Sequence, residues 1–191
     1  MSLDSRQFRE VVGLFATGVT IIVAEVEGQV HAMTANSVTS VSLDPLLMLF
    51  CPSRKSRMAQ DLPRLTRFTI NILRQDQQAL STYFAGGWKD SAPPPFRFVD
   101  SAAGPRLEGA LASIGCRTHS VTEGGDHFLV LGEVIYLHQG STPHQPLLFF
   151  AGKYRCVDFS AGVLAPDLAD GPLARWPAFT PAALDLSLIH I

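Results

Sequence analysis

Cysteine is scarce in this chain, and no long hydrophobic run is present. Cys51, Cys116 and Cys156 are widely separated and form no C-x-x-C pair. This spacing argues against a disulfide framework or a zinc knuckle, so we expect three reduced thiols, most of them buried. No stretch reaches the roughly 18 apolar residues of a membrane span, and the N-terminus carries charges where a signal peptide is apolar. We therefore expect a soluble cytoplasmic protein.

An excess of positive charge is also lacking. The chain has 15 Lys and Arg against 17 Asp and Glu, which gives a net charge of -2. A protein that binds nucleic acid or an anionic membrane usually carries a basic surface, so the charge argues against both as the main partner. A small metabolite or another protein is the expected partner.

Several nucleotide-binding and catalytic motifs are absent. The sequence contains no G-x-G-x-x-G after a strand, no G-x-x-x-x-G-K-[ST], no G-x-S-x-G and no H-E-x-x-H. If the protein binds a nucleotide cofactor, it does not use a Rossmann or P-loop motif.

The residues that are present predict a mainly β protein. We expect a helix that begins at Asp4 or Ser5 and stops at Gly18, followed by two strands joined by a tight turn at Glu27–Gly28. Further strands are expected at "LLMLFC", "RFTINIL", "SIGCRTHSVTE", "HFLVLGEVIYL" and "PLLFF". Because strands do not alternate with long helices, we predict an antiparallel barrel with an N-terminal helix and a few short covering helices.

Two short helices and a long loop complete this prediction. The helices are expected over residues 56–62 and over "DQQALSTYF", where Ala79, Leu80, Tyr83 and Phe84 share a face. Residues 85–105 are rich in Gly, Pro and Ser and predict a long loop.

We interpret the chain as one domain and a tail. Residues 1–160 form the predicted domain, because 191 residues with 47% hydrophobic composition suffice for one core. Residues 161–191 are rich in Pro and Ala, and we interpret them as a tail with a partly disordered or non-native end.

Hydroxyl groups and cations cluster in "CPSRKSR", just before the second predicted helix. Ser53, Lys55 and Ser56, with the neighbouring arginines, could bind a phosphate at the start of that helix. An ordinary solvated helix cap is the alternative interpretation.

The segment "TANSVTSVSLDP" carries short polar side chains that can bind a heterocycle or a polyol. A polar edge strand or an Asx loop explains the same residues. Asp44–Pro45 predicts a turn into the next strand.

His127 follows a predicted hairpin turn and begins a strand, where ligands often bind. Tyr154 follows Gly152 and could stack on a ring. A structural or exposed histidine and a core tyrosine are the alternatives. We expect no metal site from Cys116, His119 and His127, because the first two fall on opposite faces of one strand.

Taken in order, these segments resemble the short-chain flavin reductase family, whose fold is the FMN-binding split β-barrel. The matching segments cover roughly residues 8 to 156: "FREVVGLFATGVTIIVA", "MTANSVTSVSLDPLLMLFC", "RFTINIL", "LSTYFA", "GPRLEGALASIGC", "GGDHFLVLGEV" and "PLLFFAGKYR". The chain departs from the family pattern at Ala32, Val38 and Leu46, where the family commonly has Gly, Phe and Pro.

The resemblance implies an NAD(P)H:flavin oxidoreductase that transfers hydride from NADH or NADPH to FMN or FAD. It also implies a homodimer, and transfer of reduced flavin to a partner monooxygenase. A flavin-binding carrier or sensor without turnover is the main alternative. A structural β-barrel interaction protein is a third.

The resemblance also implies roles for particular residues. The flavin ring and ribityl chain are expected at Thr34, Ala35, Asn36 and Ser37, and the phosphate at Ser53, Lys55 and Ser56, with Cys51 beside them.

The remaining implied residues close the pocket. His127 is expected to face the flavin and the nicotinamide as the catalytic residue, and Tyr154, Phe84 and Ala85 to form the pocket wall.

Overall fold

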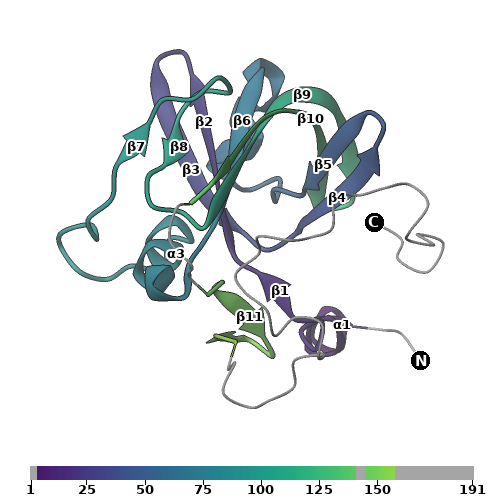
Figure 1. Cartoon of the computed structure of the whole chain (residues 1–191). Helices are drawn as coiled ribbons and strands as arrows, with labels where there is room; N and C mark the ends of the chain where they lie inside the picture. The colour runs from purple at the N-terminus through teal and green to yellow at the C-terminus, as the bar shows by residue number, and fades with distance from the viewer. Residues whose placement is uncertain (1–3, 141–144, 158–191) are drawn as a thin grey trace, which may run out of the picture. The chain divides into compact units, whose positions relative to one another are not determined.

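The structure is a computed structural model that describes residues 4–140 and 145–157. Its main element is a seven-stranded antiparallel sheet in the order β3-β2-β6-β9-β10-β5-β4 (Figure 1). The bounds are β2 Thr20–Val26, β3 Gln29–Ala35, β4 Val38–Leu43, β5 Leu46–Phe50, β6 Arg67–Ile72, β9 Ala112–Gly124 and β10 His127–Gln139. The predicted mainly antiparallel β fold is confirmed.

The two edges of this sheet meet at one point of the chain. The edge strands β3 and β4 are separated only by Asn36 and Ser37, so the sheet curls into a barrel that closes there. No ladder joins β3 to β4 within the described residues, which leaves the barrel split along this line. Bulges in β9 and β10, after Leu131 and Val134, add to the curvature.

Both predicted tight turns are present. Glu27 and Gly28 connect β2 to β3 with φ values of 53° and 76°. Two successive left-handed residues match the right-handed twist of a hairpin, which explains the position of Gly28. Asp44 and Pro45 form the turn between β4 and β5.

The N-terminal helix α1 covers Ser5–Val12 and is shorter than predicted. Asp4 caps it by accepting hydrogen bonds from the N–H groups of Arg6 and Gln7, each at 2.8 Å. The helix ends at Gly13, because glycine disfavours helix continuation. The predicted stop at Gly18 is therefore wrong, and Gly18 instead lies in β1 (Thr17–Gly18), which pairs with β11 (Leu148–Phe150).

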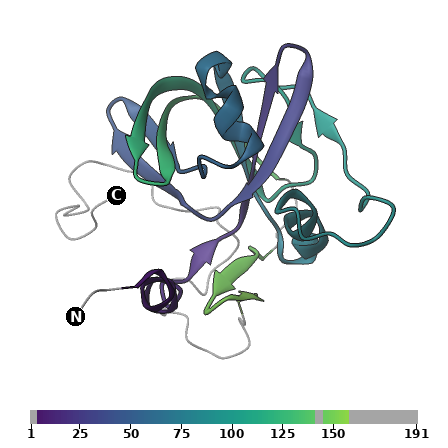
Figure 2. The ribbon, with the colours of Figure 1, turned by 180° about the vertical axis from the view of Figure 1, so that it is seen from behind.

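The other helices are short and lie against the barrel. They are α2 (Arg57–Asp61), the 3₁₀ helices η1 (Leu62–Arg64) and η2 (Gln75–Gln77), and α3 (Gln78–Phe84). Both predicted covering helices are confirmed. Figure 2 shows α2, in blue, between the β2–β3 hairpin and the β9–β10 pair.

The predicted helix face over α3 is partly confirmed. Leu80 is buried, and Tyr83 and Phe84 pack with Phe96 of the following loop, whereas Ala79 is exposed. That loop contains only one strand, β7 (Phe98–Val99), before β8 (Arg106–Leu107). β7 pairs with β8, and β11 pairs with β12 (Lys153–Arg155), both antiparallel.

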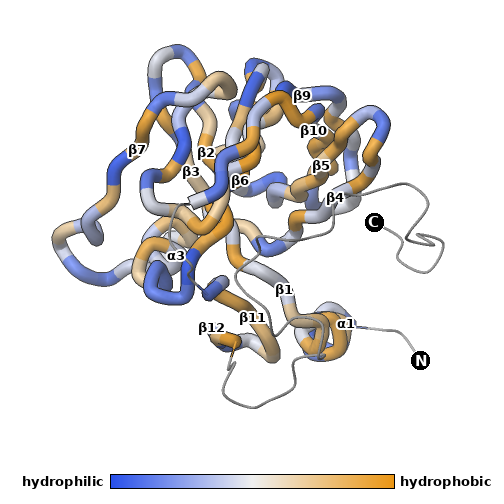
Figure 3. The backbone as a smooth tube through the Cα atoms, viewed as in Figure 1, coloured by the Kyte–Doolittle hydropathy of each residue, from blue (hydrophilic) through white to orange (hydrophobic). Residues whose placement is uncertain are grey.

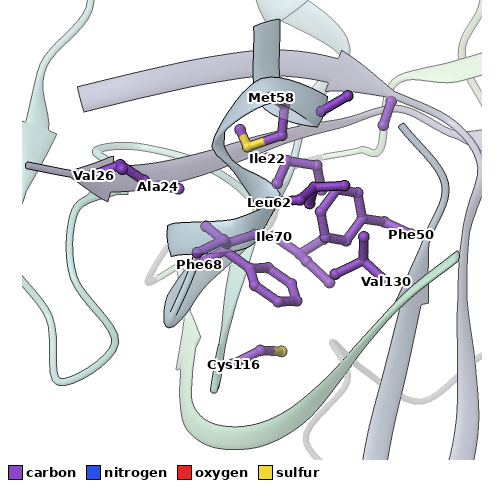
Figure 4. Close-up of a cluster of buried hydrophobic side chains, with 13 residues drawn as sticks. Ile22, Ala24, Val26, Phe50, Met58, Leu62, Phe68, Ile70, Cys116 and Val130 are labelled. Carbon is purple, nitrogen blue, oxygen red and sulfur yellow. The ribbon is translucent and has the colours of Figure 1, made fainter. Parts of the chain in front are cut away.

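Two hydrophobic clusters lie on opposite faces of β2. Ile22 points into the barrel with Phe50, Phe68 and Met58 (Figure 4), while Ile21 and Val23 pack in the second cluster, which includes Leu80 of α3. A strand that is buried on both faces explains why the sequence of β2 is continuously apolar rather than alternating. The core therefore anchors both α2 and α3 to the same sheet.

The three cysteines are free thiols but differ in burial. Cys116 lies in the barrel core, where burial raises its pKa to about 12. Cys51 is half-buried and burial also raises its pKa, whereas Cys156 is exposed. The expectation that most of the thiols are buried is wrong, because only Cys116 is fully buried: Cys51 directly follows β5, and Cys156 lies beyond the last described strand.

The predicted tail, residues 161–191, lies outside the described residues. Within residues 4–140 and 145–157, none of the helices has the length and apolar composition needed to cross a membrane.

We predict that Gly132→Ala destabilises the barrel. A Cβ at Gly132 would contact Cζ of Phe68 and lie 2.7 Å from Cβ of Cys116, both in the core. Such overpacking should lower the free energy of unfolding by about 1–3 kcal/mol. Gly18→Ala is the matched control, because a Cβ there meets no heavy atom within 4 Å. Equal midpoints for the two variants in urea denaturation would contradict this assignment of the core.

Candidate functional site

A backbone pairing joins the segment after β5 to the start of β10. Ser53 and His127 form an antiparallel bridge. On either side of it, the N–H of Phe128 donates to the carbonyl of Pro52 at 3.0 Å, and the N–H of Arg54 donates to the carbonyl of Asp126 at 2.9 Å. Two residues far apart in the sequence, both predicted site residues, therefore lie side by side.

A second pairing brings the β3–β4 connection to the same place. The N–H of Cys51 donates to the carbonyl of Ser37 at 3.1 Å, and Oγ of Ser37 donates to the carbonyl of Cys51 at 3.1 Å. Asn36, the neighbour of Ser37, is exposed. The predicted ring-binding and phosphate-binding segments thus meet at one end of β3, β5 and β10.

The predicted phosphate-binding residues form a tight turn. The N–H of Ser56 donates to the carbonyl of Ser53 at 2.9 Å, and Oγ of Ser53 accepts from the N–H of Lys55 at 3.3 Å. Oγ of Ser56 caps α2 by accepting from the N–H of Ala59 at 3.2 Å. Because α2 has only five residues, its dipole is small, and the side chains of the turn must supply most of the attraction for an anion.

Lys55 and Arg54 have different surroundings. Lys55 is exposed, and it forms no ion pair with any residue that the structure describes. Arg54 is engaged: its Nε donates to the carbonyl of Gly125 at 2.8 Å, and its Nη2 lies 2.8 Å from Oε2 of Glu123. Its guanidinium also lies over the ring of Phe128, 4.8 Å from the centroid. Lys55 is therefore available to a ligand, as is the exposed Arg57 at the start of α2, whereas Arg54 holds the β9–β10 turn.

His127 is half-exposed at the start of β10, and its Nδ1 lies 2.8 Å from Oδ1 of Asp126. This hydrogen bond lowers the pKa of Asp126. When Nδ1 donates to the carboxylate, Nε2 of the neutral ring carries the free lone pair. Asp126 was missed by the sequence reasoning, although its position directly before His127 in "GGDH" was the available signal.

The predicted wall residues form a second group around α3. The hydroxyl of Tyr154 lies 2.9 Å from Oγ of the buried Ser81, and Oγ1 of Thr34 donates to the carbonyl of Ser81 at 2.7 Å. Tyr154 also packs against Phe149. Ser81 was not among the sequence candidates, because a serine within an amphipathic helix gives no signal of a tertiary hydrogen bond.

Phe84 and Ala85 lie at the end of the same helix as Ser81. Phe84 packs among Tyr83, Phe96 and Phe98, and Ala85 is exposed. No hydrogen bond in the described chain joins these two residues to Ser53 or His127. Thr34, near the end of β3, connects the two groups. Its side chain binds Ser81 of α3, and the chain that follows it leads to Asn36 and Ser37.

Ala35 differs from its neighbours because its side chain faces the core. It is 6% exposed, and its carbonyl accepts a hydrogen bond from Oγ1 of Thr20 at 2.7 Å. A ligand at this point can contact only its backbone.

A cavity of about 400 Å³ borders Tyr154, and it is lined by Gln75, Asp76, Gln78, Leu147, Tyr154, Arg155 and Cys156. None of the other predicted site residues lines it. Among residues 4–140 and 145–157, no group of three His, Cys, Asp or Glu side chains is arranged to hold a metal ion.

Comparison with known proteins defines the class of this chain. The split antiparallel barrel has hydroxyl, amide and ammonium groups gathered at one end, and the mouth of a β-barrel is a common place for a small-molecule site. Residues 12–158 match the family model described as "Flavin reductase like domain". The chain therefore belongs to the flavin reductase-like family, and the resemblance inferred from its motifs is confirmed.

Curated relatives cover most of the chain. The reductase subunit HsaB of a flavin-dependent monooxygenase from Rhodococcus jostii is 37% identical over 169 residues, which are 86% of this chain and 84% of HsaB. The NADH-dependent flavin reductase StyB of Pseudomonas fluorescens is 38% identical over 157 residues, which are 81% of this chain and 91% of StyB.

Solved structures give the same result. The flavin reductase PheA2 superposes with a TM-score of 0.77 at 41% identity, over 82% of this chain and 99% of PheA2. The NADH:FAD oxidoreductase SgcE6 of Streptomyces globisporus superposes with a TM-score of 0.72 at 34% identity, over 81% of this chain and 96% of SgcE6.

Proposed function

We propose that this chain is an NADH-dependent flavin reductase that supplies reduced flavin to a partner monooxygenase. The observation that carries the proposal is the meeting of Asn36–Ser37, Ser53–Ser56 and His127 at one end of a flavin reductase-like barrel. Relatives described as reductase subunits or components of monooxygenases support the proposal that the reduced flavin is passed to a monooxygenase. We place the reaction in the cytoplasm, where free thiols such as those of this chain stay reduced.

The residues at this end of the barrel fit a flavin. Asn36 and Ser37 offer an amide and a hydroxyl to the ribityl chain, and Lys55 offers a positive charge to the phosphate beside the hydroxyls of Ser53 and Ser56. The backbone around Thr34 and Ala35 would hold the ring. When bound, the flavin supplies the redox chemistry by accepting a hydride from the nicotinamide.

The protein's own contribution is position and electrostatics. Hydride transfer requires two rings held in close contact, so the side chains must orient them and exclude water. Asp126 holds Nδ1 of His127, which leaves Nε2 to contact the nicotinamide or the flavin. A protonated His127 would also stabilise negative charge on the reduced ring. Cys51, whose thiol is kept neutral by burial, contributes packing rather than charge.

We also propose that the protein is a homodimer. The apolar face of α1 is exposed in the single chain, where Phe8 is 66% exposed and Val11 69%. Figure 3 shows hydrophobic positions along α1 in orange. The outer surfaces of β4, β5, β9 and β10 carry further exposed hydrophobic residues, namely Val41, Leu43, Leu46, Val121, Leu129, Ile135 and Leu137. Exposed apolar area of this extent is typical of an interface, and a second copy of the chain supplies the matching surface.

The function is tested by mixing the purified protein with NADH and either FMN or FAD, and by following the loss of absorbance at the reduced-nicotinamide band. We expect flavin-dependent oxidation of NADH. NADPH run in parallel determines the donor preference. A protein that binds flavin but is reduced by neither nucleotide would be a carrier or sensor, and a protein that binds no flavin would contradict any flavin function.

We predict that His127→Ala lowers kcat/KM for NADH about tenfold to a hundredfold, because one oriented group at the reacting rings is lost. Flavin affinity should change little, since the phosphate contacts remain. His119→Ala is the matched control, because His119 is also exposed but lies along β9 away from the paired segment. Steady-state rates of His127→Ala equal to those of the unmodified protein would remove this role.

We predict that Phe8→Ser combined with Val11→Ser converts the dimer to a monomer. Both side chains lie on the exposed apolar face of α1, so the changes remove interface area without disturbing the core of the chain. Gln7→Ser on the same helix is the control. Size-exclusion chromatography with light scattering measures the mass, and a monomeric unmodified protein would contradict the proposal.

A further inference from the structure

A buried ion pair lies outside the residues assigned to the site. Nδ1 of His31 forms a hydrogen bond with Oδ2 of Asp61, and the side chains are only 12% and 7% exposed. In every other ion pair of the described chain, at least one partner is half-exposed or more. Breaking this pair would leave the buried Asp61 carboxyl without its histidine partner, so this contact constrains the two elements that carry it more than a surface pair would.

Those two elements carry the two halves of the proposed flavin site. His31 lies in β3, three residues before Thr34, where the ring-binding end of the strand begins. Asp61 is the last residue of α2, whose first turn is capped by Ser56 of the phosphate-binding turn. The pair therefore ties the strand that leads to the ring end to the helix that follows the phosphate end.

Arg64 extends this connection to the opposite end of β3. Its Nη2 lies 3.5 Å from Oδ1 of Asp61, and its Nη1 donates to Oε2 of Glu27 at 2.9 Å. Glu27 lies in the turn that begins β3. Arg64 and His31 thus contact the two carboxylate oxygens of Asp61. Through Glu27, this network connects the end of α2 to the start of β3 as well as to His31 within it.

The phosphate-binding turn consequently has two separate supports. The pairing of Ser53 with His127 holds its beginning, and the contact of Asp61 with His31 holds the helix at its end. Lys55 and Ser56 lie between these supports. Apolar packing of Met58 and Leu62 in the core holds α2 against the barrel, but it does not set the position along β3 as sharply as a directional hydrogen bond.

We propose that His31 and Asp61 are positioning residues that set the distance between the ring-binding and phosphate-binding segments, and so give the protein its preference for phosphorylated flavins. This proposal rests on the proposed function. A misplaced ammonium or hydroxyl loses contact with the phosphate, whereas contacts with the ring and ribityl chain depend on β3 and are retained. Loss of the pair should weaken binding of FMN but not of riboflavin, which has no phosphate.

The test compares FMN with riboflavin as substrates for the unmodified protein, Asp61→Asn and His31→Ala, with NADH saturating. We expect KM for FMN to rise about tenfold, equivalent to about 1.4 kcal/mol of lost phosphate contact. KM for riboflavin and kcat at saturating flavin should stay within about twofold of the unmodified values. A purely structural role predicts equal changes for both flavins, or none.

Two further variants separate positioning from loss of stability. Thr69→Val removes a buried hydroxyl of β6 that donates to the carbonyl of Pro105 at 2.7 Å and accepts from Nδ2 of Asn71 at 3.0 Å. Neither partner belongs to the His31–Asp61 pair or to the phosphate-binding turn, so this variant should lower the thermal midpoint without changing the ratio of the two KM values. His31→Asn places an amide donor where Nδ1 stood and should restore most of the preference for FMN. If Asp61→Asn does not fold, His31→Asn still tests the proposal. In that variant Asp61 keeps a hydrogen-bond donor, the new amide, and its contact with Arg64.

The results distinguish failure of the positioning role from failure of the proposed function. A preference for FMN that is unchanged in His31→Ala or Asp61→Asn overturns the positioning role, and so does a His31→Asn protein that folds but prefers FMN no more than His31→Ala does. An unmodified protein that oxidises no NADH with either flavin overturns the proposed function instead. An unmodified protein that reduces both flavins with equal KM values overturns the phosphate site on which the inference is built.

Discussion

The pairing of residues 52–54 with residues 126–128 is the interaction on which the candidate site depends. β5 ends at Phe50, and without this pairing the chain that follows would leave the barrel as an unsupported loop. The two backbone hydrogen bonds continue the β5–β10 ladder beyond its last regular pair, Phe50 with Val130. They place the Ser53–Ser56 turn beside His127, and Arg54 strengthens the pairing by binding Gly125 and Glu123.

The closure of the barrel supplies the third part of the site. Because β3 and β4 are opposite edges of one sheet joined by two residues, Asn36 and Ser37 lie where the curl of the sheet ends. Ser37 then binds Cys51, the first residue after β5. The polar residues of this region cannot join a regular ladder on both sides, which leaves Asn36 free to face a ligand. The split in the barrel and the position of the site therefore have the same cause.

Much of this fold could be predicted from local patterns. The apolar strands, the Glu27–Gly28 turn and the Ser56 cap each follow from residue chemistry within a few positions. The arrangement of Ser53 opposite His127 could not be derived locally, because register across the sheet depends on the whole barrel. Resemblance to a family supplied that long-range information. The engagement of Arg54, the hydrogen bond from Thr34 to Ser81 and the buried pair of His31 with Asp61 were not foreseen.

The errors have physical reasons as well. The predicted helix extended to Gly18 because apolar residues continue at helical spacing as far as Phe15. The hydrogen-bonded helix ends earlier, at Gly13. The apolar face of α1 is exposed in the single chain, which supports the proposed homodimer. The predicted role of Ala35 is not among these errors: strand alternation turns its side chain into the barrel, so the prediction applies to its backbone.

In the proposed function, three separate segments form one flavin site. Titration of the isotope-labelled protein with FMN, followed by amide chemical shifts, tests this arrangement. We predict that the largest shifts occur together at residues 34–37, 51–56 and 126–127, with one dissociation constant, while the β4–β5 turn and the β7–β8 pair change little. Shifts confined to the cavity around Gln75 and Tyr154, or absent from residues 51–56, would contradict it.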